Sequence, residues 1–75
     1  MTKGEYRVGT TFNPSKNSEV DEIKRLAAAL IDKIAAIDDV GEAEIARCKA
    51  LGMTTIEEGA MWGVKAATKE PPKEE

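Results

Sequence analysis

The side chains best suited to chemistry begin at Phe12, the only phenylalanine of the chain, which stands in a polar segment ahead of the first expected helix. It is followed by Asn13, Pro14 and Ser15, residue types that favour turns. Two interpretations of Phe12 are open. The ring is either a hydrophobic lid folded over the helices or a stacking platform, with Asn13 and Ser15 beside the ligand. A base stacked on an aromatic face gains about 1 to 3 kcal/mol.

Three more side chains are candidates for contacts with the same kind of ligand. The first turn of a helix offers free N–H groups to a phosphate, and Lys24, about one and a half turns into the first expected helix, adds positive charge. Thr54 and Thr55 lie in the middle of the second expected helix. Such hydroxyls either bond back to their own helix or, at a symmetric interface, face a polar ligand.

The residue types that enzymes and metal sites need are scarce. The sequence has no histidine and one cysteine, which excludes an internal Ser-His or Cys-His nucleophile pair, a disulfide and a structural zinc site. The adjacent carboxylates Asp38/Asp39 and Glu57/Glu58 are typical of a solvated surface, and Cys48 is expected to pack on an apolar stripe. We therefore expect no enzyme, no metal and no cofactor.

Charge and hydropathy narrow the partners further. The net charge is −3, which argues against binding to long nucleic acid, because that depends on clustered basic residues. Residues 1–16 are locally basic, with three basic residues and one acidic. The longest apolar run, residues 26–31, is far shorter than the roughly 20 residues of a membrane span. With no secretory signal and a free thiol, the sequence predicts a cytoplasmic protein without a membrane partner.

The expected elements are an N-terminal arm over residues 1–17, a helical hairpin over 18–69 and a disordered, Pro-rich tail over 70–75. In the arm, residues 6–8 are expected to be briefly extended. Ser18 is the expected N-cap of the first helix, with Asp21 in the position of a capping box. The apolar stripe of this helix recurs at three- and four-residue steps: Val20, Ile23, Ala27, Leu30, Ile34 and Ile37. A short break at residues 37–42 predicts an antiparallel partner helix from Glu42 to about Lys69.

Two features of the second helix suggest that the hairpin does not act alone. Gly52, Gly59 and Gly63 share one stripe, which indicates close approach of another backbone there; a kink or fraying at Gly52 is the alternative. The outer faces of the hairpin still carry large apolar residues, typical of an interface: Leu26, Leu51, Met53, Met61, Trp62 and Val64. We therefore predict an all-α antiparallel helical hairpin with an N-terminal arm, assembled into a homo-oligomer.

Two stretches of this sequence carry a family resemblance: "FNPSKNSEVDEIKRLAAALIDKI" and "ARCKALGMTTIEEGAMWGVKAATK". They resemble the small phage proteins that sponge cyclic nucleotide signals, the anti-CBASS sponges, whose hairpin is shared with the anti-Thoeris sponges. The resemblance covers about Arg7 to Lys69. It implies a homo-hexamer in the host bacterial cytoplasm that captures cyclic dinucleotides, and also cyclic trinucleotides or cyclic ADP-ribose isomers, without cleaving them.

The resemblance also implies roles for particular residues. Phe12 corresponds to the aromatic residue that stacks on a base, Lys24 to a lysine that meets the phosphates, and Thr54 to a threonine of the trinucleotide site. Better-known members often have Tyr in place of Phe12, and Arg where this chain has Met53. A second hypothesis from another class is a protein-interaction module that docks a partner through its Trp62/Met61 face.

Overall fold

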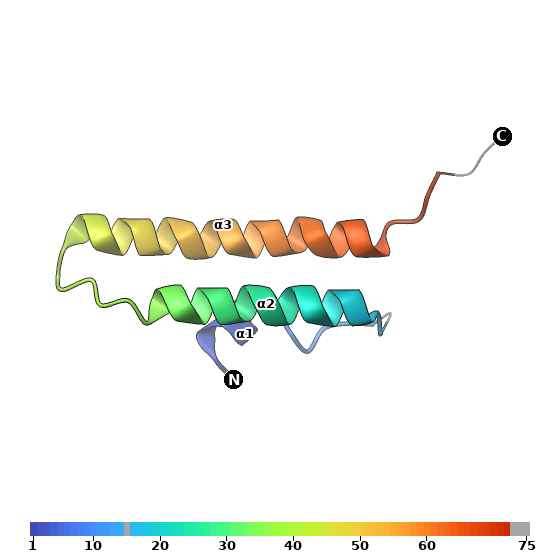
Figure 1. The fold of residues 1–75 in the computed structure, drawn as a ribbon, viewed down its shortest axis with the longest axis horizontal. Helices are drawn as coiled ribbons and strands as arrows, with labels where there is room; N and C mark the ends of the chain where they lie inside the picture. The colour runs from blue at the N-terminus through green and yellow to red at the C-terminus, as the bar shows by residue number, and fades with distance from the viewer. Residues whose placement is uncertain (15, 73–75) are drawn as a thin grey trace.

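The computed structural model describes residues 1–14 and 16–72, and its regular structure there is entirely helical. The helices are α1 (Lys3–Val8), α2 (Ser18–Ala35) and α3 (Ala43–Thr68). Figure 1 shows α2 and α3 side by side and antiparallel, with α1 against α2. The prediction of an all-α helical hairpin is confirmed. At 57 × 26 × 12 Å, the molecule is flat and about one helix thick at its thinnest.

Polar caps set the ends of the two long helices. The N-cap of α2 is Asn17, whose side chain accepts hydrogen bonds from the N–H groups of Glu19 and Val20. The predicted cap at Ser18 was wrong by one residue, because the amide oxygen of Asn17 takes the role assigned to the Ser18 hydroxyl. The N-cap of α3 is Glu42. Just before it, Gly41 has a φ of +75°, a left-handed conformation that glycine adopts without strain.

Helix α1 lies where the sequence predicted an extended segment at residues 6–8, and that prediction was wrong. A capping box starts the helix: the Glu5 N–H donates to Thr2 Oγ1 at 3.0 Å, and the Thr2 N–H donates to Glu5 Oε1 at 2.7 Å. Gly9 ends it with a φ of +73°. An isolated six-residue helix is unstable in water, so α1 depends on its packing against the hairpin.

The contact between α1 and α2 is tight at Gly4. A Cβ atom at this position would lie 2.1 Å from the Ala28 carbonyl oxygen, so only glycine allows the two backbones to approach this closely. The Gly4 N–H also donates to Asp32 Oδ1 at 2.7 Å. A carboxylate on α2 thus binds a free N–H in the first turn of α1.

The core is small and differs in part from the predicted stripe. Its buried apolar residues are Val20, Ala27, Ala28, Ile31, Met53 and Ala60. Leu30 and Ile37, predicted to be in the core, are half exposed, while Ile31 is fully buried. Helix α1 packs on a second face of α2, at Ala28 and Asp32. Two further predictions were wrong: Met53 is 7% exposed and lies in the core, and Cys48 is exposed near the connection between α2 and α3.

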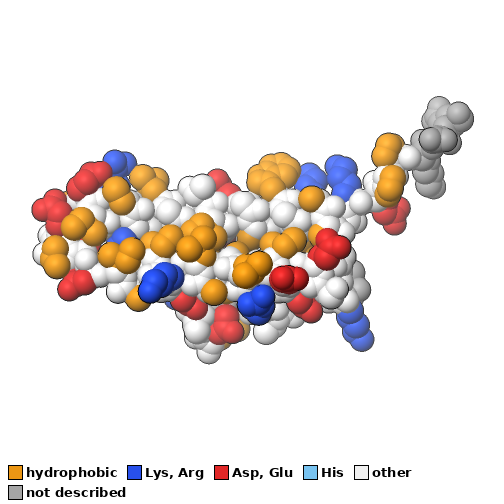
Figure 2. All heavy atoms as spheres, viewed as in Figure 1, with side chains coloured by type: hydrophobic (Ala, Val, Ile, Leu, Met, Phe, Trp, Pro, Cys, Tyr) orange, Lys and Arg blue, Asp and Glu red, His pale blue; other side chains and the backbone are white. Residues whose placement is uncertain are grey.

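Large apolar side chains remain on the outside of the hairpin: Leu26, Leu51, Met61 and Trp62. Figure 2 shows hydrophobic side chains in a band that runs along the hairpin. The accessible surface is 5796 Å², whereas a folded monomer of this mass exposes about 4500 Å².

The glycine stripe of α3 does not meet a backbone within the chain. A Cβ at Gly52 or Gly63 would touch only isoleucine side chains of α2, and one at Gly59 would meet nothing within 4 Å. Helix α3 runs through Gly52 without interruption, so the predicted alternative of a kink or fraying there is wrong. Gly59 faces open space in the single chain.

Candidate functional site

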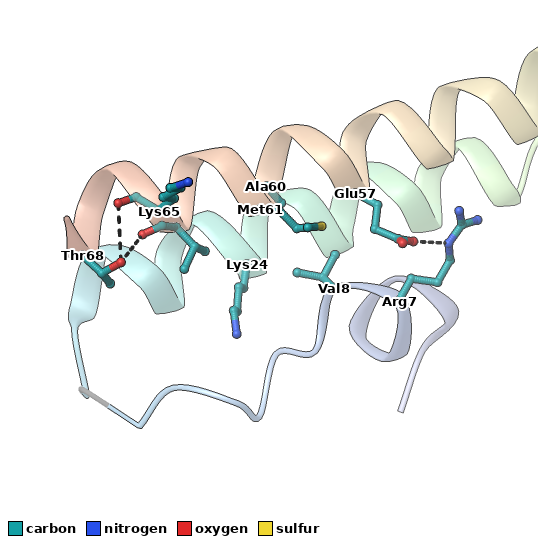
Figure 3. A pocket seen from close by; sticks show the side chains of 9 residues that line it. Arg7, Val8, Lys24, Glu57, Ala60, Met61, Lys65 and Thr68 are labelled. Carbon is teal, nitrogen blue, oxygen red and sulfur yellow. Dashed lines mark hydrogen bonds and ion pairs between the residues drawn. The ribbon is translucent and has the colours of Figure 1, made fainter.

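A groove opens where α1, α2 and α3 meet. Its volume is about 550 Å³, within the roughly 300–1,000 Å³ of small-molecule sites. It is lined by Arg7 and Val8 of α1, Lys24 of α2, and Glu57, Ala60, Met61, Val64, Lys65 and Thr68 of α3. A smaller hollow of about 290 Å³ adjoins it and shares three of these residues, while Phe12, Asn13, Pro14 and Val20 complete its lining. Figure 3 shows the groove side chains and the elements that carry them.

Lys24 holds the loop that follows α1. Its ammonium group donates to the carbonyl oxygen of Gly9 at 3.0 Å and to that of Phe12, and the residue is only 7% exposed. In Figure 3, the side chain extends from α2 toward this loop. An ammonium group has three N–H donors, and these two bonds to the loop use two of them.

Phe12 is presented at the surface rather than buried. The residue is 70% exposed, and Lys24 Nζ lies 5.4 Å from the ring centroid. The Phe12 N–H donates to the Gly9 carbonyl at 3.0 Å, so the backbone on both sides of the ring is fixed. A lid over the hairpin requires a buried ring, and the single chain does not provide one. The exposed face is available for stacking.

Asn13 secures the turn into α2. Its Nδ2 donates to the Asn17 carbonyl and to Asp21 Oδ1, both at 2.8 Å, and its Oδ1 accepts from the Asn17 N–H. Asn17 also donates to the Ala67 carbonyl at 3.3 Å, which ties the loop to the end of α3. The predicted ligand residue Asn13 therefore lines the smaller hollow and holds the loop. Ser15 lies outside the described residues.

Arg7 bridges α1 to α3 at the other end of the groove. Its Nε lies 2.8 Å from Glu57 Oε1, and its Nη2 donates to Thr54 Oγ1 at 3.3 Å. Figure 3 shows Arg7 and Glu57 pointing toward each other from the two helices. Thr54, a predicted ligand residue, therefore lies beside the groove cation Arg7. The neighbouring Thr55 is exposed and lines neither cavity.

A comparison with protein-family models identifies the family of the chain. The model of the Acb2/Tad1 hairpin domain matches residues 4–68. The chain belongs to this family. The members of this family are the anti-CBASS and anti-Thoeris sponges, phage proteins that sponge cyclic nucleotides. The predicted family resemblance is therefore confirmed. Searches of curated proteins and of solved structures found no match.

The charge of the groove suits an Acb2/Tad1 hairpin protein, since cyclic nucleotides are anions. Among its lining residues, Arg7, Lys24 and Lys65 are positive and Glu57 is negative, while the chain as a whole carries −3. The lining of the groove is therefore net positive in a protein that is acidic as a whole. Within the described residues, no cluster of three or more potential metal ligands occurs, and no helix is long and apolar enough to cross a membrane.

The sequence did not identify Arg7, Glu57 or Lys65 as parts of the site. The local excess of positive charge in residues 1–16 was the only signal for Arg7. Glu57 gave none, because it was grouped with Glu58 as solvated surface. Both become recognisable only when α1 folds back and places Arg7 against a residue 50 positions later.

Proposed function

We propose that this protein is a phage-type immune-evasion sponge that binds cyclic oligonucleotide or cyclic ADP-ribose-type signals and holds them without cleaving them. The observation that carries the proposal is the match of residues 4–68 to the Acb2/Tad1 hairpin domain. The groove and the adjoining hollow support it, because three cationic side chains line the first and the exposed Phe12 lines the second.

The ligand contacts that we propose follow the groove. Phe12 stacks on a base, and the remaining N–H of Lys24 meets a phosphate. Thr54 contacts the ligand beside Arg7, while Asn13 holds the loop that carries Phe12. Thr55, which lines neither cavity, remains a candidate for a second site between subunits, and Ser15 remains a candidate ligand contact in the segment that follows Phe12.

We further propose that the ligand site is completed by other copies of the chain, in a homo-hexamer located in the cytoplasm of the bacterial host. The exposed apolar band and the large accessible surface support self-association. The open space at Gly59 leaves room for the backbone of another subunit. Trp62 and Met61 are also exposed, so a second copy is the simplest occupant of the surface that suggested an interaction module.

Calorimetry tests the sponge directly. The protein is titrated with cyclic di-AMP, cyclic GMP–AMP, cyclic tri-AMP and cyclic ADP-ribose, with linear pApA as the uncyclised control. We expect at least one cyclic compound to bind, and chromatography after heat denaturation to recover it unchanged. Recovery of a linear product would show cleavage, and failure of the whole panel to bind would contradict the sponge.

A further inference from the structure

The ion pair on the groove wall is less exposed to solvent than the other ion pair of the described residues. The described part of the chain has two ion pairs, Arg7–Glu57 and Arg47–Glu44. The second lies within one turn of α3, with both side chains 63% exposed. The first joins α1 to α3 and is partly buried, with side chains 24% and 36% exposed. A partly buried pair is screened less by solvent and salt, so its charges matter more to a ligand in the groove.

Arg7 retains capacity for an anion. A guanidinium group carries five N–H donors, and the bonds to Glu57 and Thr54 use two of them. Arginine can bind a phosphate through two parallel N–H groups. Glu57, however, is the one carboxylate among the residues that line the groove, and it is in contact with this cation.

We propose that Glu57 is an internal competitor for Arg7 and thereby determines which anions the groove accepts. In the empty groove, Glu57 holds the guanidinium group. When a cyclic nucleotide binds, one of its phosphodiesters displaces the carboxylate and takes the Arg7 N–H groups. A ligand that cannot replace the Glu57 contact has no compensation for breaking it, so the pair selects against weakly charged ligands. This inference rests on the proposed sponge function.

Whether Glu57→Gln raises or lowers ligand affinity separates the competitor role of Glu57 from a purely structural role. Glu57→Gln keeps an oxygen that can accept from Arg7 Nε but removes the negative charge. We expect it to bind the panel's tightest cyclic dinucleotide on the order of three- to tenfold more tightly, with a steeper loss of affinity as salt rises. The matched control is Glu58→Gln, which changes the net charge equally at an exposed neighbour outside the groove. We expect its affinity to stay within about twofold of wild type.

Arg7→Gln completes the experiment. It should weaken binding by about tenfold, and in its background Glu57→Gln should produce a much smaller gain. The proposal is overturned if Glu57→Gln binds no more tightly than wild type, if Glu58→Gln gives the same gain, or if Arg7→Gln binds normally. Wild-type binding without these effects refutes only the competitor role. If wild type binds nothing in the panel, the sponge function itself fails.

Discussion

Gly4 is the position where a single methyl group should detach α1 from the hairpin. In Gly4→Ala, the new Cβ would lie 2.1 Å from the Ala28 carbonyl oxygen and 2.8 Å from its carbonyl carbon. These are backbone atoms of a packed helix, so α1 must move instead. A shift of more than about 1 Å is needed to reach ordinary contact distance, and it would break the 2.7 Å hydrogen bond from the Gly4 N–H to Asp32.

The size of the effect follows from these two losses. Forcing an extra carbon into a packed interface costs about 1–3 kcal/mol, and a hydrogen bond to a charged group contributes about 1.5–3 kcal/mol. The two overlap, because moving α1 relieves the clash by breaking the bond. We expect α1 docking to weaken by about 2 kcal/mol or more. If the domain unfolds as one unit, Tm falls by about 8–16 °C.

Circular dichroism melts combined with amide hydrogen exchange measure both consequences. Faster exchange confined to residues 3–9 would show local release of α1, and a lower Tm would show cooperative loss. Gly52→Ala is the matched control, since its Cβ would meet Ile34 Cδ1 at an ordinary 3.6 Å. Alanine favours the helix by about 1 kcal/mol, so this variant should melt higher. A Gly4→Ala protein with wild-type Tm and a protected α1 would refute the docking described here.

Three further predictions concern the ligand and the assembly. Phe12→Ala should lose about 1–3 kcal/mol of cyclic-nucleotide affinity by calorimetry, with little change in Tm because the ring is exposed. Phe12→Tyr should retain most of the wild-type affinity. A much lower Tm with normal affinity in Phe12→Ala would contradict stacking. Lys24→Ala should weaken binding and flatten its salt dependence, and an unchanged affinity would leave Lys24 only its bonds to the loop. Light scattering should give a homo-oligomer, with a hexamer favoured, and a monomer of 8.1 kDa at micromolar concentration would refute self-assembly.

The hairpin was predictable because its signals are local and repeated. Apolar residues at three- and four-residue steps define both long helices, and the break at residues 37–42 separates them. The sequence could not show which side of α2 is buried, because that depends on α1. Ile31 is fully buried although it lies off the predicted stripe, and Leu30 is half exposed although it lies on it. A six-residue helix gives almost no periodic signal.

The features of the candidate site could be predicted only where they lie in neighbouring residues. The aromatic ring at Phe12, the turn residues after it and a lysine early in the next helix could be read along the chain. The bonds from Lys24 to two backbone carbonyls could not be, since carbonyl groups are identical in every residue. The Arg7–Glu57 pair was also invisible, because it depends on the folded position of α1.

The same contacts that build the groove also hold α1 in place. Alone, α1 is too short to persist, and it is retained by the Gly4 contact, the Asp32 hydrogen bond and the Arg7–Glu57 pair. A ligand that binds Arg7 only when α1 is docked must stabilise the docked state by mass action. By the same linkage, a change that loosens α1 without altering the charge of the groove lowers ligand affinity, even at a residue that touches no ligand. Under the proposed function, Gly4 and Asp32 therefore contribute to ligand affinity although neither Gly4 nor Asp32 lines the groove.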